Sequence, residues 1–147
     1  MAIFVSGETQ LAYEVHGAGF PILLIAPGGL RSERGMWRGS PLNPLAALSD
    51  HFQVIAMDQR NAGESTGPIE SDHDWNTYTE DQLDLMTHLG HGRFAVVGMC
   101  IGGPYILNLL KTAPEGIVAS AVMQAIGRDN NREEFLTMFD GWAGHLQ

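Results

Sequence analysis

The stretch that decides the fold is Phe94-Ala95-Val96-Val97-Gly98-Met99-Cys100-Ile101-Gly102-Gly103. Its first four residues are apolar and predict a buried strand. A thiol between small residues follows, and the next residues predict a helix that runs to about Lys111. Glycine has no Cβ, so Gly98 and Gly102 permit a turn too sharp for other residues. The stretch therefore predicts a strand, a tight turn that carries Cys100, and a helix.

A strand, turn and helix with a nucleophile at the turn is called a nucleophile elbow. The N-terminus of a helix presents unpaired N–H groups and the positive end of the helix dipole, and both favour an anion. A thiol at this position loses its proton more readily, and the thiolate is the reactive form. We therefore expect Cys100 to act as a nucleophile.

Strands and helices alternate along the predicted chain. An alternation of this kind implies a mostly parallel sheet with helices on both faces, which is the α/β class. We expect the core of the fold to cover residues 1–127. Residues 128–147 carry apolar side chains at helical spacing and predict an amphipathic helix, which is either the start of a lid or a terminal helix. The pattern predicts strands over 10–15, 21–26, 52–57, 94–97 and 117–123, and helices over 45–48, 75–89 and about 101–111.

The composition restricts the classes of partner and cofactor. The 147 residues carry a net charge of −9 without a basic stripe, so we expect no nucleic acid and no anionic membrane as a partner. The N-terminus lacks the features of a secretory signal, and the one cysteine fits a reducing interior, which indicates the cytoplasm. The histidines lack the spacing of metal ligands and no glycine-rich nucleotide motif is present, so we expect neither a metal nor a cofactor.

Three motifs follow one another in a characteristic order, and together they resemble the N-terminal part of an α/β-hydrolase. Pro27-Gly28-Gly29 stands where that family usually has His-Gly-x, after a buried strand. Asp58-x-Arg60-x-x-Gly63-x-Ser65 is close to the family's Asp-x-Arg-Gly-x-Gly-x-Ser turn, and the elbow around Cys100 is the third motif. The resemblance covers nearly the whole chain and implies an incomplete α/β-hydrolase core.

The resemblance implies roles for particular residues. The backbone N–H groups of Gly29 and Ile101 are expected to form the oxyanion hole that stabilises charge on a substrate carbonyl. Cysteine in place of serine is similar to dienelactone hydrolase-like members, in which the thiol attacks a carbonyl. Met36 and Trp37 are candidates to line an acyl pocket beside the glycine loop, and the alternative is that they only cover core. Asp58 and Arg60 are expected to hold the turn in which they lie.

The catalytic acid and histidine of the family are not evident. Both come after the nucleophile in the family's order. Asp129 follows the strand after the elbow helix and is the candidate acid, and His145 is the only histidine after Cys100. His88 and His91 flank the end of the helix before the elbow strand, at the end of the sheet opposite the nucleophile.

Three functions stay open on this basis. The first is a hydrolase that acts on an ester, thioester or lactone through a cysteine acyl-enzyme. Its acid and histidine would come from sequence absent here, and the isolated chain would then be impaired. The second is a shortened, non-catalytic relative that acts as an interaction module, in which a second chain or a second copy completes the sheet beside the strand over 117–123. The third is an acyltransferase that uses the same intermediate.

Overall fold

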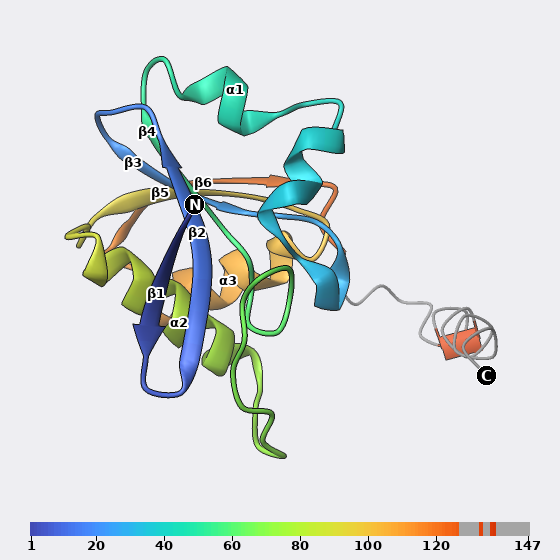
Figure 1. Ribbon diagram of the computed structural model, residues 1–147. Coiled ribbons are helices and arrows are strands. Elements are labelled where there is room, and N and C mark those ends of the chain that lie inside the picture. The colour runs from blue at the N-terminus through green and yellow to red at the C-terminus, as the bar shows by residue number, and fades with distance from the viewer. Residues whose placement is uncertain (127–132, 134–135, 138–147) are drawn as a thin grey trace.

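The structure is a computed structural model that describes residues 1–126, 133, 136 and 137. Strands and helices alternate through most of this range (Figure 1), as the sequence predicts for the α/β class. In chain order the elements are β1 (Ala2–Ser6), β2 (Thr9–His16), β3 (Pro21–Ile25), the 3-10 turns η1 (Gly29–Arg31) and η2 (Arg34–Gly39), α1 (Pro44–Leu48), β4 (Gln53–Met57), α2 (Trp75–His88), β5 (Phe94–Met99), α3 (Gly102–Thr112) and β6 (Ile117–Met123).

The described strands form one sheet in the order β1-β2-β4-β3-β5-β6. The four strands β4, β3, β5 and β6 are parallel to their neighbours. The pairs β1–β2 and β2–β4 are antiparallel, so the first two strands form a hairpin at one edge. The predicted mostly parallel sheet is confirmed. Since β3 and β5 are central and parallel, the loops that follow them leave the sheet at the same edge.

Helices cover both faces of the sheet. In Figure 1, α1 and η2 lie on one side and α2 and α3 on the other. Strand β3 is buried on both faces because its residues alternate between two cores. Leu23 packs in the same cluster as Ile106 of α3, whereas Leu24 packs with Trp37 of η2 and Leu45 of α1. The prediction of a doubly buried strand over 21–26 is confirmed.

Each strand and helix predicted over residues 1–126 is present, and β1 is the strand that the prediction missed. A half-buried strand is predicted from apolar residues that alternate with polar ones. In β1 the apolar residues Ile3 and Val5 are 43% and 58% exposed, so they do not form a buried face. Strand β1 exists through its pairing with β2, in which Ala2 lies opposite Tyr13. The helix predicted over 128–147 lies almost wholly outside the described residues.

Strand β6 forms the other edge of the described sheet. It pairs with β5, and five of its seven residues are exposed. Val118 and Val122 are 42% and 43% exposed, which is high for apolar residues of a strand. The prediction that residues 117–123 form a strand is confirmed.

Candidate active site

Cys100 occupies the tight turn between β5 and α3. Its backbone has a φ of 57°, in the left-handed region that residues with a Cβ adopt only at a cost. The residue is partly exposed, so the thiol is not sunk in the core. A single strained residue held between a central strand and a helix is the geometry that the sequence predicts for a nucleophile elbow.

Glycine is required on both sides of Cys100 because other parts of the backbone come very close. A Cβ added to Gly98 would lie 2.9 Å from the carbonyl oxygen of Gly102. A Cβ added to Gly102 would lie 2.7 Å from the carbonyl oxygen of Ile25 at the end of β3. Carbonyl groups of a strand or a helix start cannot rotate away as a side chain can. The glycines therefore let the elbow approach β3.

Backbone hydrogen bonds hold the elbow to the end of β6. The N–H of Cys100 donates to the carbonyl oxygen of Met123 over 3.0 Å. The carbonyl oxygen of Cys100 accepts from the N–H groups of Gly103, at 3.0 Å, and Ile126, at 3.3 Å. With these groups satisfied, the strained conformation of Cys100 is fixed by its surroundings.

The predicted oxyanion loop begins directly after β3. Gly28 and Gly29 have φ values of 119° and 59°, so both adopt a conformation that favours glycine. Strand β3 is the parallel neighbour of β5, with Ile25 opposite Gly98, which places this loop beside the elbow. Among the described residues, no hydrogen bond takes up the N–H of Gly29 or of Ile101. The predicted role of these two N–H groups as the oxyanion hole stays a prediction, and the topology is compatible with it.

A set of polar contacts fastens the glycine loop to the turn after β4. The Ser32 hydroxyl donates to the carbonyl oxygen of Ala26 over 2.7 Å, and the carbonyl oxygen of Ser32 accepts from the N–H of Gln59 over 2.9 Å. Asp58, which is 2% exposed, accepts from the backbone N–H of Arg34 over 2.7 Å. Nothing in the sequence marks Ser32 or Arg34 for this role, because their partners in the turn after β4, Gln59 and Asp58, lie far along the chain.

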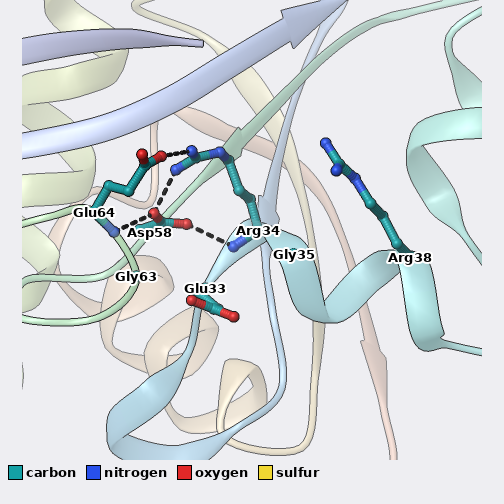
Figure 2. Close-up of a pocket in the computed structure, with 7 residues that line it drawn as sticks. All are labelled: Glu33, Arg34, Gly35, Arg38, Asp58, Gly63 and Glu64. Carbon is teal, nitrogen blue, oxygen red and sulfur yellow. Dashed lines mark hydrogen bonds and ion pairs between the residues drawn. The ribbon is translucent and has the colours of Figure 1, made fainter.

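Arg34 is the centre of a partly buried cluster of three charged side chains (Figure 2). Its guanidinium group donates to the carboxylates of Asp58 and Glu64, and the N–H of Glu64 donates to Asp58 over 2.9 Å. Burial by itself lowers the pKa of Arg34, but the bonds to Glu64 and Asp58 outweigh it and raise that pKa above its usual value. These groups line a charged cleft of about 350 Å³ whose walls do not include Cys100. Since the oxygens of Asp58 are already used, the cluster holds the loop in place.

The turn over residues 58–65 is held as the sequence predicts, but Asp58 and Arg60 have different partners. Arg60 forms two hydrogen bonds with Asp81 of α2, at 2.9 and 2.7 Å, and these bonds raise the pKa of Arg60. The Ser65 hydroxyl donates to the carbonyl oxygen of Asp58 over 2.9 Å. Asn61 has a φ of 60°, a left-handed conformation that asparagine tolerates better than most residues.

The other predicted site residues fall in three places. Met36 is 39% exposed, and its terminal methyl lies 3.0 Å from where a Cβ of Gly28 would be. Trp37 is fully buried in the core below α1, and a substrate contact of either residue stays a prediction. Asp129 and His145 lie outside the described residues. His88 stacks on Phe4, with ring centroids 4.6 Å apart.

Two classes of feature are absent from the part of the chain that the structure describes. No group of three or more histidine, cysteine, aspartate or glutamate side chains there is arranged to hold a metal ion. No helix in the same residues has the length and hydrophobicity needed to cross a membrane.

Comparison with known proteins shows the family. A model of the alpha/beta hydrolase fold matches residues 21–146. The chain therefore belongs to the α/β-hydrolase family. The sheet order, the elbow and the glycine loop described above are consistent with that membership.

Three similar proteins have known names. A protein of Klebsiella pneumoniae named "Putative carbamate hydrolase RutD" is 31% identical over 101 residues, which are 69% of this chain and 36% of that protein. The 2-hydroxy-6-oxo-6-(2'-aminophenyl)hexa-2,4-dienoic acid hydrolase of Metapseudomonas resinovorans is 30% identical over 83% of this chain and 41% of its own length. A thermophilic esterase from Thermogutta terrifontis is 28% identical, with a TM-score of 0.72 over 86% of this chain and 44% of the esterase. The chain thus spans less than half the length of these relatives.

Proposed function

We propose that this chain carries the nucleophile of a hydrolase that acts on an ester, thioester or lactone through an acyl–cysteine intermediate. The observation that carries the proposal is the position of Cys100, partly exposed at a left-handed turn directly before α3. The unused N–H groups of Ile101 and Gly29 support an oxyanion hole there. Similarity to an esterase supports the ester class among the possible substrates.

In the proposed first step, the thiolate of Cys100 attacks the carbonyl carbon of the substrate. The carbonyl oxygen gains the negative charge, and the N–H groups of Gly29 and Ile101 stabilise it. The C–O or C–S bond to the leaving group then breaks, and the leaving group departs with the electron pair. The acyl group is left on Sγ as a thioester, and the proton of the original thiol passes to solvent.

The second step needs a base, because water is too weak a nucleophile to release the acyl group quickly. The described residues after Cys100 contain no histidine, and Asp129 remains the candidate acid. We therefore expect the isolated chain to acylate faster than it deacylates. An acyltransferase would use the same intermediate with another acceptor in place of water. The chemistry needs a free thiol, which supports a reducing compartment such as the cytoplasm.

The proposal is tested with p-nitrophenyl acetate and intact-protein mass spectrometry. We expect a burst of p-nitrophenolate, and a gain of one acetyl group per chain that peptide mapping places on Cys100. Cys100→Ala should abolish both the burst and the acetyl group. Lys111→Arg is the matched control, because it removes the only lysine of the chain and should leave the burst unchanged. Equal labelling of wild type and Cys100→Ala would refute the assignment of the nucleophile.

The exposed edge of β6 favours a second candidate function, an interaction module whose sheet is extended by a second copy of the chain. Val118 and Val122 are 42% and 43% exposed, and β6 carries no lysine or proline of the kind that blocks edge pairing. Analytical ultracentrifugation tests this proposal. We expect a dimer that Val118→Lys disrupts and that Val5→Lys, on the other edge of the sheet, does not. A monomer at all concentrations contradicts it.

A further inference from the structure

The glycine loop after β3 is closed on itself by Ser32. The loop covers residues 27–31, between Ala26, the residue after β3, and Ser32, the residue after η1. The Ser32 hydroxyl donates to the carbonyl oxygen of Ala26 over 2.7 Å, and the Ser32 N–H donates to the carbonyl oxygen of Gly29 over 3.2 Å. One fully buried residue thus ties both the start and the middle of the loop.

The direction of the Gly29 N–H depends on the peptide group between Gly28 and Gly29. In a trans peptide the C=O and the N–H point in opposite directions. The carbonyl oxygen of Gly28 accepts from the N–H of Arg31 over 3.0 Å, so the N–H of Gly29 points away from Arg31. Since Arg31 directly precedes Ser32, the bonds made by Ser32 also hold this donor in place.

The loop needs these hydrogen bonds because its two glycines give it little stiffness. Gly28 and Gly29 have φ values of 119° and 59°, and glycine adopts such conformations as readily as many others. A Cβ added to Gly29 would meet no other group of the described residues within 4 Å, so packing does not hold this residue. Hydrogen bonds therefore fix the direction of the Gly29 N–H.

Ser32 can fix the loop because Ser32 is itself held from outside the loop. Its carbonyl oxygen accepts from the N–H of Gln59 over 2.9 Å, and two residues further on the N–H of Arg34 donates to Asp58 over 2.7 Å. Asp58 and Gln59 directly follow β4, which is the parallel neighbour of β3. The Ser32 hydroxyl thus links the loop to a point that the sheet holds.

We propose that Ser32 is a positioning residue of the oxyanion hole, whose hydroxyl aims the Gly29 N–H at the carbonyl oxygen of the substrate. This inference rests on the proposed hydrolase, because it gives Ser32 a role in the acylation of Cys100. Ser32 is fully buried and acts only through Gly29. An oxyanion donor is effective within about 2.7–3.1 Å of the developing charge, so a displaced Gly29 loses this stabilisation.

Ser32→Ala removes the hydroxyl and leaves the backbone bonds of that residue in place. The carbonyl oxygen of Ala26 then loses its donor, and the loop gains freedom. Complete loss of an oxyanion donor slows a reaction by about 10²–10³, so we expect displacement of Gly29 to slow acylation by about tenfold to a hundredfold. Alkylation of Cys100 by iodoacetamide should be unchanged. In that reaction the C–S bond forms as iodide leaves with the electron pair, and no charge develops on a carbonyl oxygen.

Two rates measured on the full chain test the proposal. The first is the rate of the p-nitrophenolate burst at saturating p-nitrophenyl acetate, and the second is the rate at which iodoacetamide alkylates Cys100. In Ser32→Ala we expect the first rate to fall and the second to equal that of wild type. The ester concentration that gives half the maximal burst rate should also be unchanged, because the ground state is bound as before. Equal falls of both rates would show a general disturbance of the elbow and would overturn the proposal.

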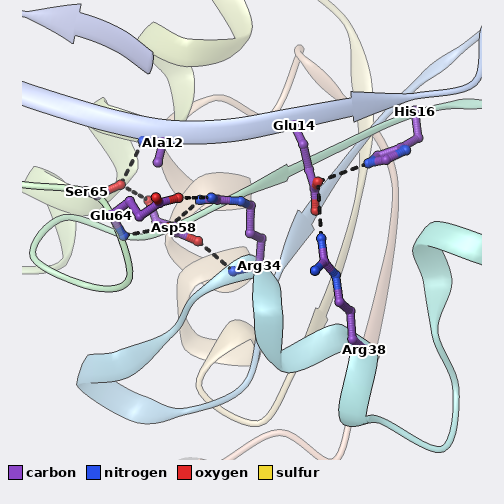
Figure 3. Close-up of polar contacts among 8 residues, drawn as sticks. All are labelled: Ala12, Glu14, His16, Arg34, Arg38, Asp58, Glu64 and Ser65. Atoms are coloured by element: carbon purple, nitrogen blue, oxygen red, sulfur yellow. Dashed lines mark hydrogen bonds and ion pairs between the residues drawn. The ribbon is translucent and has the colours of Figure 1, made fainter. Parts of the chain in front are cut away.

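Ser65→Ala is the matched control, because Ser65 is a buried serine outside the glycine loop. It is 3% exposed, and its hydroxyl donates to the carbonyl oxygen of Asp58 and accepts from the N–H of Ala12, each over 2.9 Å (Figure 3). The variant loses buried hydrogen bonds of the same kind, so it should be destabilised at least as much as Ser32→Ala. The ratio of the burst rate to the alkylation rate should equal that of wild type. An equal fall of this ratio in both variants contradicts the proposal.

If Ser32→Ala does not fold, Ser32→Cys carries the test. A thiol fits nearly the same space but is a weak donor, so the ratio of the two rates should again fall. Peptide mapping distinguishes the new thiol from Cys100. A ratio equal to that of wild type overturns the proposal.

Failure of this inference differs from failure of the proposed hydrolase. If wild type gives no burst, the proposed function is overturned and the role of Ser32 with it. If wild type gives a burst that requires Cys100, and the Ser32 variants give the same burst rate, only the role of Ser32 is overturned.

Discussion

Gly102→Ala tests whether the elbow depends on close approach to β3. The new Cβ would lie 2.7 Å from the carbonyl oxygen of Ile25, and ordinary contact begins at 3.4 Å, so α3 and β3 would have to separate by about 0.7 Å. Overpacking of this kind costs about 1–3 kcal/mol. Alanine is the better helix former by up to about 1 kcal/mol, but less at the first residue of a helix, so we expect a net loss of stability.

Gly92→Ala is the matched control. Gly92 has nothing within 4 Å of an added Cβ and no positive φ, so alanine should stabilise the protein by about 0.4–1 kcal/mol. Urea denaturation, followed by tryptophan fluorescence to which the buried Trp37 contributes, measures both variants. The two free energies of unfolding should differ by about 2 kcal/mol, which is the overpacking cost at Gly102, less its gain in helix propensity, added to the gain at Gly92. If Gly102→Ala is as stable as Gly92→Ala, the close-approach argument is wrong.

Three further variants probe the site and its supports. Asp58→Asn should lower the free energy of unfolding by about 3 kcal/mol, because it leaves the partly buried Arg34 with only the exposed Glu64 as a charged partner, whereas Asp50→Asn on the surface should have no effect in the same urea assay. Cys100→Gly should raise stability by about 1 kcal/mol in thermal or urea unfolding, since glycine relieves the left-handed strain, and should abolish acylation; a loss of stability would contradict the strain. Burial raises the pKa of Tyr105 above its ordinary 10.0, so stability should be complete below about pH 10 and fall as the pH rises further. Tyr105→Phe should weaken that fall, and an unchanged pH profile would count against the burial of the phenol.

Local patterns were sufficient to predict most of the fold. Continuous apolar runs indicated β3 and β5, which are buried between helices, and the same reasoning placed β6 over 117–123. Strand β1 was missed because an edge strand with exposed apolar residues has no one-sided pattern, and its pairing with β2 becomes visible only in the sheet. The elbow was predicted because its requirements fall on adjacent residues, from Gly98 to Gly102.

The sequence by itself determined the class of fold, the order of its motifs and the position of the tight turn that carries Cys100. Those features depend on residue types at short spacing, which act through local sterics and periodicity. Only the tertiary structure decided that Arg34 and Ser32 fasten the glycine loop and that Arg60 pairs with Asp81. Each of these contacts joins residues brought together by chain folding, and burial decides whether a polar atom is satisfied or left without a partner.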